Sequence, residues 1–361
     1  MRIAVIGAGN SGLAMAAHLS KEGHQVILWN RSSATIEHLI QTKAIRCFGA
    51  ITGNIPIYHV TNQMKEALED VNLVFITTPA TAHRDLAQSI ALNCNSNLTV
   101  ILNPGRTFGA LEFKQIFEAY QQKFQLQVAE AQTIIYTCRK LDDDGVNILA
   151  LKNDILLSAI QAQETLPIIR SLPLCLQEFY IPAKSMIQTS IGNVGMILHC
   201  APLLLNAGWT ESSTNTYKYY YDGISPTISK FLEKIDEERI AVSKKLGCAV
   251  ESIIEWFQRT YHITGETLYD CIQNNVSYHT IDAPSSLQHR YIFEDIPCGL
   301  VPLESVGIML GLDMSSTSLI IDLASKLLNT NFRAIGRTVQ LFEFADFMEP
   351  RKDLPYVPIQ P

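Results

Sequence analysis

Residues 2–17 of the chain, RIAVIGAGNSGLAMAA, decide its fold. The apolar run at residues 3–6 predicts a short β-strand, the pattern G-x-G-x-x-G at residues 7–12 predicts a tight turn, and the small apolar residues at 13–19 predict a helix. In such a unit the glycines let a pyrophosphate approach the backbone at the helix N-terminus, where the helix dipole favours negative charge. We therefore predict a dinucleotide site, with a purely structural glycine turn as the alternative, and assign to it Gly7, Gly9, Asn10 and Gly12.

The end of the predicted second strand, QVILW at residues 25–29, indicates which dinucleotide is bound. An Asp or Glu at this corner normally binds the ribose of NAD, about twenty residues past the glycines. Here the strand is followed by Asn30, Arg31 and Ser32, without an acid. Arg31 is suited to pair with a 2′-phosphate, and Asn30 and Ser32 are suited to donate hydrogen bonds to it. We predict NADP(H) over NAD(H); the alternative is that Arg31 is a solvated loop cation.

Two further predicted strands end in turns with polar or proline residues. Residues 71–77 run into Thr78 and Pro79, and residues 97–102 run into Asn103. Ligands of open α/β sheets bind at the carboxyl ends of parallel strands. We therefore predict that these turn residues border the ribose and the nicotinamide; the alternative is that they are ordinary turn residues.

The sequence pattern changes near residue 182. Before it, residues 127–136 predict a strand and the alternation at 146–158 predicts a hairpin or edge pair. After it, apolar residues recur at helical spacing. We predict an α/β protein with a Rossmann-type doubly wound sheet over residues 1–182, followed by an all-α domain over residues 183–361 that ends in a loose tail from Pro350.

Composition limits the class of protein. The 361 residues are 47% hydrophobic and 17% charged, which suits two soluble domains with sizeable cores. The formal net charge of -7 gives no support for binding to nucleic acid or to an anionic membrane surface. Because the first strand begins too early and is too short for a signal peptide, we expect a cytoplasmic protein.

Neither a metal centre nor a membrane span is predicted. The eight cysteines occur singly, with no C-x-x-C pair, which indicates reduced thiols and no zinc site. The longest apolar stretch, residues 187–205, contains Gln188, Asn193, His199 and Pro202. These polar residues favour one long buried helix over a membrane span.

Within that predicted helix, Gly192, Gly195 and His199 are spaced to lie on one stripe. The glycines would leave room for a cofactor or substrate beside His199, which would then donate or accept a proton. The alternative is that the glycines let another helix pack closely and that His199 is a hydrogen-bonded core residue.

The stretch QHRYIFEDIP at residues 288–297 combines an arginine and two acids in an aromatic segment. The planar guanidinium of Arg290 is suited to hold a substrate carboxylate with two hydrogen bonds. Asp295 is a candidate to accept the ring N–H of His199, which would fix the tautomer of the imidazole and stabilise its protonated form. A structural ion pair between Arg290 and Asp295 is an equally good interpretation of these residues.

Six segments of the chain together carry a resemblance to one enzyme family. They are GAGNSGLAMAAHL from Gly7, LNPGRTFGALEF from Leu102, TCR from Thr137, HCAPLLLNAG from His199, YYYDGISP from Tyr219 and RYIFEDIPCGLVPLE from Arg290. In this order and spacing they resemble the opine dehydrogenase family, the octopine/nopaline dehydrogenase group, over essentially the whole chain. The resemblance implies a Rossmann domain and a helical domain that enclose a cleft. There NAD(P)H reversibly reduces the imine formed from a 2-oxo acid, such as pyruvate, and the amino group of an amino acid.

The resemblance also implies roles for individual residues. The family's catalytic histidine falls on His199, its partner aspartate on Asp295 and its keto-acid arginine on Arg290. Thr133 and Cys138 fall where family members line the keto-acid pocket. The sequence departs from NADH-using members at residues 30–31, where those members carry an acid, so we expect NADP(H), with NAD(H) as the alternative.

Two other functions stay open at this point. A reductase of the ketopantoate reductase or glycerol-3-phosphate dehydrogenase type acts on one small acid or phosphate with a catalytic lysine, but residues 187–205 contain no lysine and Lys184 lies just before them. A regulatory protein that binds NADPH without turnover would leave the histidine, arginine and aspartate without a task. The predicted partners are a 2-oxo acid and an amino acid, neither of them identified. A homodimer is expected only because it is the commonest assembly.

Overall fold

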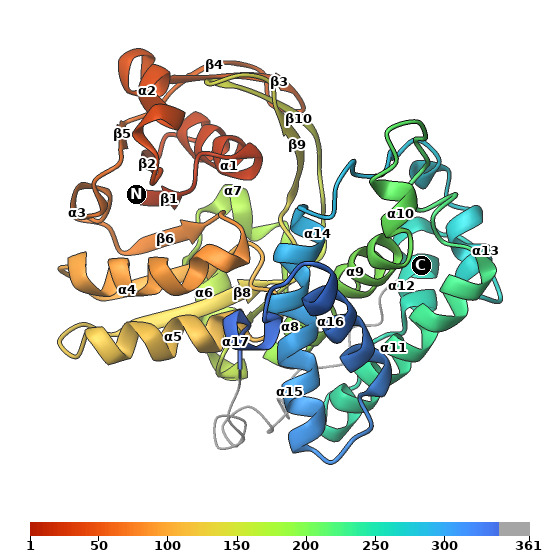
Figure 1. Ribbon diagram of the computed structural model, residues 1–361. Coiled ribbons are helices and arrows are strands. Elements are labelled where there is room, and N and C mark those ends of the chain that lie inside the picture. Colours follow the sequence, from red (N-terminus) through yellow and green to blue (C-terminus); the bar gives the residue numbers. More distant parts are fainter. Residues whose placement is uncertain (339–361) are drawn as a thin grey trace. The chain divides into compact units, whose positions relative to one another are not determined.

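The computed structural model describes residues 1–338, which fall into two compact units (Figure 1). The first unit is Met1–Ser190 and the second begins at Ile191. The predicted domain limits, 1–182 and 183–361, stay a prediction, and the tail predicted from Pro350 lies outside the described residues.

The first unit is built on an eight-stranded sheet. Along the sheet the strands are β12 (Tyr180–Pro182), β11 (Ile155–Ala159), β8 (Leu126–Ala131), β7 (Leu98–Leu102), β6 (Leu73–Ile76), β1 (Arg2–Ile6), β2 (Gln25–Trp29) and β5 (His59–Thr61). All neighbours pair in parallel except β11 and β8. The chain runs from β1 outward to β5 and then crosses back to β6 on the other side of β1. The predicted doubly wound Rossmann sheet is therefore confirmed, and its order reverses between β1 and β6, where such sheets bind ligands.

Helices cover both faces of this sheet, which is why β1 is an unbroken apolar run with Ile3–Ile6 fully buried. Figure 1 shows α1 on one face and the adjacent α4 and α5 on the other. The helices of this unit are α1 (Asn10–Lys21), α2 (Ser33–Thr42), α3 (Met64–Ala67), α4 (His83–Asn93), α5 (Gly109–Tyr120), α6 (Thr165–Ser171), α7 (Leu174–Gln177) and α8 (Met186–Ile191), the last of which ends just past the unit boundary.

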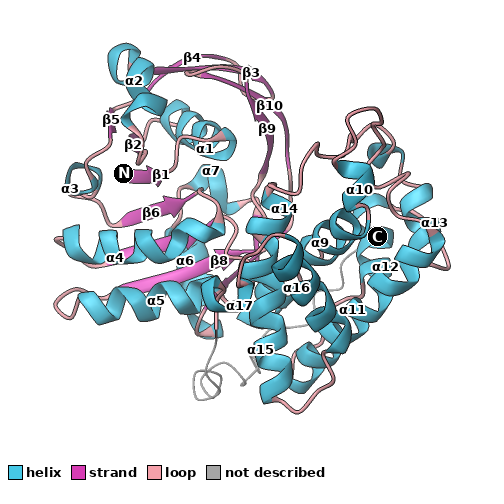
Figure 2. Ribbon diagram, in the orientation of Figure 1, coloured by secondary structure: helices cyan, strands magenta, loops and turns pink. Residues whose placement is uncertain are grey.

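A second, four-stranded sheet arches over α1, as Figure 2 shows in magenta. Its strands are β4 (Gly53–Pro56), β3 (Ala44–Gly49), β10 (Gly145–Leu151) and β9 (Tyr136–Lys140). The hairpin predicted at residues 146–158 is wrong, because β10 pairs with β3 and β9 in this small sheet, whereas β11 joins the large one. The strand predicted at residues 127–136 is present, but its predicted end is wrong, since β8 ends at Ala131. Alternation predicts that a segment is extended but not which distant strand it pairs with.

The described part of the second unit contains helices and a single isolated β-bridge, in agreement with the predicted all-α domain. Its helices are α9 (Gly195–Leu205), α10 (Ala207–Thr210), α11 (Pro226–Lys245), α12 (Ile253–Tyr261), α13 (Leu268–Gln273), α14 (Arg290–Phe293), α15 (Val301–Met309), α16 (Ser315–Leu327) and α17 (Phe332–Ile335). A short π-helical turn, η4 (Ile296–Leu300), joins α14 to α15.

The single long helix predicted at residues 187–205 is wrong. The chain forms α8 and then α9, with Gly192, Asn193 and Val194 between them. Gly192 is a weak helix former, and the side-chain Oδ1 of Asn193 accepts the backbone N–H of Gly195 at 3.0 Å, so a new helix begins there. Gly192 therefore does not share a helical stripe with His199.

Three features of the described residues bear on the type of protein. All eight cysteines lie among them, and none forms a disulfide. Within residues 1–338 no three His, Cys, Asp or Glu side chains are arranged to hold a metal ion. In the same part of the chain, none of the helices combines the length and the apolar character needed to cross a bilayer.

Candidate active site

The turn between β1 and α1 has the geometry that a dinucleotide requires. Gly7 has φ +114°, and a Cβ at Gly12 would lie 1.7 Å from the carbonyl oxygen of Gly7, so only glycine lets the helix start this close to the strand. A Cβ at Gly9 would meet nothing within 4 Å. The turn is thus closed on the protein side and leaves space over Gly9.

The N-terminus of α1 supplies backbone hydrogen-bond donors beside this space. Gly9 caps the helix without a side chain, and the first turn contains no acid. The first backbone N–H groups of a helix have no partner within it. Thr78, which follows β6, contributes a buried hydroxyl that has no hydrogen-bond partner within residues 1–338, and its Cγ2 lies 2.8 Å from the Cβ position of Gly7. These donors and the space over Gly9 fit the pyrophosphate of a dinucleotide.

The three residues after β2 differ in their exposure and in the hydrogen bonds that their side chains make. Asn30 accepts the Ala8 N–H at 3.1 Å and donates to the Ser32 carbonyl oxygen at 3.1 Å, so its side chain ties the glycine turn to this corner. Arg31 and Ser32 are exposed. Among the described residues, the guanidinium of Arg31 makes no ion pair or hydrogen bond. Arg31 and Ser32 are therefore the residues of this corner whose side chains are available to the 2′-phosphate of a cofactor.

Pro79 and Asn103 lie at the carboxyl ends of β6 and β7, as predicted. Pro79 precedes the short 3-10 helix Ala80–Ala82. The Asn103 side chain is 2% exposed, donates to the Ile101 carbonyl oxygen at 3.0 Å and accepts the Tyr180 hydroxyl at 2.9 Å. The Asn103 amide thus holds the end of β7 in place, which leaves its backbone as the part that can border a cofactor.

Asn10 and Cys138 join the glycine turn to the small sheet. Asn10 Oδ1 accepts the backbone N–H of Lys140 at 2.8 Å, and the Cys138 side chain interacts with that of Ser11. Burial raises the pKa of the Cys138 thiol, so it stays protonated near pH 7. Thr133 lies partly buried in the turn between β8 and β9. The structure therefore puts Cys138 next to the first turn of α1.

Sequence reasoning missed Glu130, a fully buried carboxylate at the end of β8. It accepts the Thr189 hydroxyl and the Ala110 backbone N–H, both at 2.9 Å, and the Ser190 hydroxyl. A Cβ at Gly105 would lie 2.4 Å from the Cβ of Glu130. Glu130 thus holds the loop after β7 at the ligand-binding edge of the sheet. The available signal was a lone acid in the otherwise weakly polar strand LQVAEA.

The second unit brings together His199 and Asp295. Nδ1 of His199, on α9, lies 2.7 Å from Oδ2 of Asp295, which follows α14. The Asp295 side chain is 1% exposed and the His199 side chain 15%. Because a carboxylate only accepts hydrogen bonds, Nδ1 carries the proton and Nε2 is left for other chemistry.

A close approach of two backbone segments makes this contact. A Cβ at Gly299, in η4, would lie 2.8 Å from the Cβ of Met196 on α9. Only glycine lets η4 pack this tightly on α9, and η4 begins directly after Asp295. The predicted hydrogen bond between Asp295 and the His199 ring is therefore present in the fold.

An aromatic cluster surrounds the imidazole. The Tyr291 ring stacks on it with centroids 3.9 Å apart and an interplanar angle of 11°. The Tyr219 hydroxyl donates to the backbone carbonyl oxygen of His199. Nearby His289 caps α14, with its Nδ1 accepting the Tyr291 N–H at 3.3 Å. Burial, followed by the charge of Arg290, lowers the pKa of His289, so this second imidazole is neutral near pH 7.

Arg290 is exposed at the start of α14. Within residues 1–338 its guanidinium makes no hydrogen bond or ion pair, and Asp295 bonds to His199. The alternative ion pair between Arg290 and Asp295 is therefore wrong. Arg290 is left with a free planar fork, the form in which arginine holds a carboxylate.

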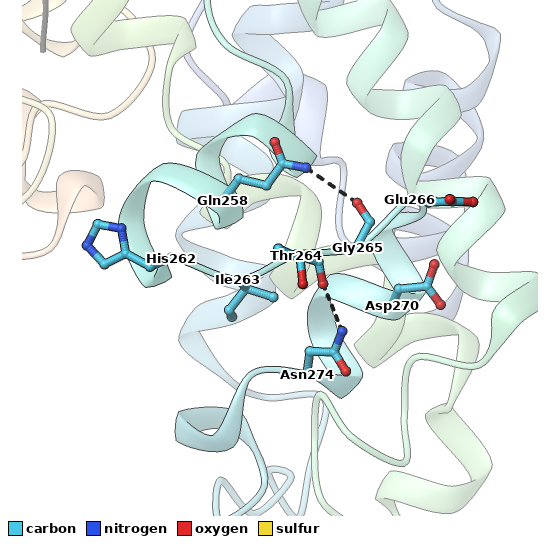
Figure 3. A pocket seen from close by; sticks show the side chains of 8 residues that line it. All are labelled: Gln258, His262, Ile263, Thr264, Gly265, Glu266, Asp270 and Asn274. Atoms are coloured by element: carbon cyan, nitrogen blue, oxygen red, sulfur yellow. Dashed lines mark hydrogen bonds between the residues drawn. The ribbon is translucent and has the colours of Figure 1, made fainter. Parts of the chain in front are cut away.

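The second unit also has a surface hollow, which Figure 3 shows between the end of α12 and α13. None of the predicted site residues lines it. Gln258 and Asn274 donate to the carbonyl oxygens of Gly265 and Thr264, and Asp270 completes the capping box of α13 with the N-cap residue Thr267. The polar side chains of this hollow thus hold its own loop.

Both halves of the chain match families of known proteins. Residues 2–131 match the family described as NAD-dependent glycerol-3-phosphate dehydrogenase N-terminus, and residues 182–328 match the one described as NAD/NADP octopine/nopaline dehydrogenase, alpha-helical domain. An opine dehydrogenase from Arthrobacter sp. (strain 1C) is 32% identical over 338 residues, which cover 93% of each chain.

Two solved structures share the fold. Octopine dehydrogenase with NADH and L-arginine has a TM-score of 0.78 at 18% identity, over 91% of this chain and 90% of the other. Yersinopine dehydrogenase with NADP⁺ bound has a TM-score of 0.75 at 15% identity, over 96% of this chain and 95% of the other.

The helical half distinguishes among the functions left open by the sequence. The match of residues 2–131 describes the dinucleotide-binding half, whereas the match of residues 182–328 is to octopine and nopaline dehydrogenases. The reductase of a single small acid and the non-catalytic NADP-binding protein are therefore set aside. With this match and 32% identity to an opine dehydrogenase over 93% of its length, the chain belongs to the opine dehydrogenase family, oxidoreductases that use NAD(P)H and act on the CH–NH group of their donors.

Proposed function

We propose that His199, Asp295 and Arg290 carry the reductive condensation of a 2-oxo acid with the amino group of an amino acid. In this reaction the amine and the carbonyl lose water to form an imine, and the imine takes up a hydride and a proton to give a secondary amine. The observation that carries the proposal is the 2.7 Å contact between His199 Nδ1 and the buried Asp295 carboxylate.

His199 acts as the acid and base of the condensation. Its Nδ1–H is held by Asp295, which directs Nε2 to the reacting groups and stabilises the imidazolium. Attack of the amine on the carbonyl carbon produces a hydroxyl that must leave as water. Nε2 of the protonated imidazole gives that hydroxyl its proton, and the neutral imidazole takes up the proton lost by the amine.

Arg290 holds the carboxylate of the 2-oxo acid. Its guanidinium has no competing partner among the described residues, and it lies five positions before Asp295, the hydrogen-bond partner of His199. A bidentate pair fixes the carbonyl carbon relative to its reaction partners, and such fixing of the reactants can lower the barrier by several kcal/mol. Thr133 and Cys138 are further candidates for contact with this substrate.

The cofactor is NADPH in preference to NADH. When bound, it supplies the hydride that reduces the imine carbon. The donors at the start of α1 hold its pyrophosphate, and Arg31 pairs with its 2′-phosphate. Support comes from the exposed, unpaired Arg31 guanidinium and from the NADP⁺ bound by yersinopine dehydrogenase.

Pyruvate is the proposed 2-oxo acid, because octopine dehydrogenase binds pyruvate. The same enzyme binds L-arginine and agmatine. The cytoplasmic location and the homodimer expected from the sequence stay predictions.

The cofactor assignment predicts the effect of Arg31→Ala. We expect kcat/KM to be higher with NADPH than with NADH in the unaltered enzyme, and Arg31→Ala to lower it about 10- to 100-fold with NADPH only, since one charge-assisted contact is lost. Steady-state kinetics with both cofactors measure this. Arg170→Ala, at an exposed arginine of α6, is the control. A clear preference for NADH in the unaltered enzyme would contradict the assignment.

The acid–base role predicts the effect of His199→Gln. Turnover should fall about 10²- to 10⁴-fold, the usual contribution of a positioned acid or base, while NADPH still binds. Condensation rates and NADPH fluorescence titration give the two measurements. His279→Gln, at a histidine that hydrogen-bonds the Gln273 carbonyl oxygen, should keep near-normal turnover. Retained turnover in His199→Gln refutes the role.

The carboxylate role predicts the effect of Arg290→Lys. We expect KM for the 2-oxo acid to rise about tenfold or more, because a point charge cannot replace the planar fork. KM for the amino acid should change little. Initial rates at varied concentrations of each substrate separate the two constants, with Arg259→Lys as the control at another arginine of this unit. An unchanged KM for the oxo acid counts against Arg290.

A further inference from the structure

Tyr291 lies between two imidazoles, and only one of them has a role in the proposed reaction. Its ring stacks on His199 with centroids 3.9 Å apart and planes 11° apart. The ring of His289 meets it edge-on, with centroids 4.5 Å apart and planes 86° apart. Tyr291 thus covers one face of the imidazole whose edge is bound by Asp295.

Tyr291 is itself held from several directions. Its backbone N–H donates to His289 Nδ1 at 3.3 Å, and its carbonyl oxygen accepts the Cys200 thiol at 3.3 Å. Its side chain interacts with that of Tyr220, and its ring lies 5.2 Å from that of Tyr219. A ring restrained in this way is able to restrain its neighbour.

We propose that Tyr291 is the positioning residue for His199, which fixes the plane of the imidazole so that Nε2 faces the reacting hydroxyl. The inference rests on the proposed function, because it assigns Tyr291 a task in the chemistry of His199. A single hydrogen bond at Nδ1 holds one edge of the ring but still allows rotation about that bond. A parallel ring at contact distance removes this rotation.

The aromatic face also favours the protonated imidazole. A cation over a tyrosine face is attracted by the ring quadrupole, more strongly where water is excluded. The titratable and charged groups around His199 are Asp295 after α14, His289, Arg290 and Tyr291 at its start, Tyr219 and Tyr220 before α11, and Cys200 on α9 itself. Burial and Arg290 lower the pKa of His289, so it adds no opposing charge near pH 7. Tyr291 and Asp295 thus act in the same direction on the imidazolium.

Three variants distinguish the effect of the Tyr291 ring from the effect of its hydroxyl and from a general effect on the fold. Tyr291→Leu removes the aromatic face and still shields the imidazole from water, whereas Tyr291→Phe keeps the face and removes the hydroxyl. Tyr221→Leu is the matched control, because Tyr221 contacts the ring of His279, with centroids 4.4 Å apart, in the same unit. The first readout is the pH profile of kcat with saturating substrates.

We expect Tyr291→Leu to lower kcat about tenfold with little change in KM for the 2-oxo acid. The alkaline limb of its profile should move to lower pH by about half a unit, because the protonated imidazole loses the attraction of the ring. Tyr291→Phe should restore both values to within about twofold of the unaltered enzyme, and Tyr221→Leu should change neither. A profile that does not move in Tyr291→Leu, or one that moves equally in Tyr291→Phe, overturns the proposal.

The second readout needs neither activity nor a stable Leu variant. Protons over an aromatic face are shifted upfield, so the imidazole C–H signals of His199 in the unaltered enzyme, assigned by their loss in His199→Gln, should lie upfield of those of exposed histidines. Signals at the ordinary position overturn the stacking. Retained turnover in His199→Gln defeats the proposed function, whereas lost turnover there with an unmoved profile in Tyr291→Leu defeats the role of Tyr291 alone.

Discussion

The hydrogen bond between the His199 imidazole and the Asp295 carboxylate is the constraint on which the proposed chemistry depends. A carboxylate with 1% of its side chain exposed is costly to bury unless it is well hydrogen-bonded, and the imidazole N–H provides such a bond. The same bond decides the tautomer and leaves Nε2 for the substrate. The close packing of η4 on α9 at Gly299 is what allows it.

The dinucleotide turn obeys a different constraint, which is steric. The strand and the helix meet so closely at Gly7 and Gly12 that no other residue fits, while the space over Gly9 is open. Asn30 and Asn10 then tie the turn to β2 and to the small sheet through the Ala8 and Lys140 N–H groups. Asn10, Asn30 and Asn103 hold backbone in place, whereas the helix N-terminus, Thr78 and Arg31 are the groups proposed to contact the cofactor.

The features that sequence predicts best here are local ones. The turn at residues 7–12 and the strand at 25–29 carry their signals within a few residues, and both form as predicted. The pairing of β10 with β3 joins segments far apart in the chain, so alternation alone could not find it. Helical spacing likewise overlooked the break at Gly192 and Asn193 that divides residues 187–205.

The candidate site shows the same division. The contact of His199 with Asp295, 96 positions apart, was available from residue chemistry and a family resemblance. The orientation of the side chains could not be predicted from the sequence. Whether Arg290 or His199 pairs with Asp295 depends on how η4 packs on α9, and the stacking of Tyr291 and the buried hydrogen bonds of Glu130 depend on three-dimensional packing in the same way.

The most direct test of the account is a double-mutant cycle on kcat/KM for the condensation, with His199→Gln, Asp295→Asn and the double variant. If Asp295 acts through the imidazole, removing it from an enzyme that already lacks His199 costs almost nothing further, so the double variant is about as slow as His199→Gln alone. If the fold-losses of the two single variants multiply in the double variant, the two residues act independently. That result would contradict a functional pair of His199 and Asp295.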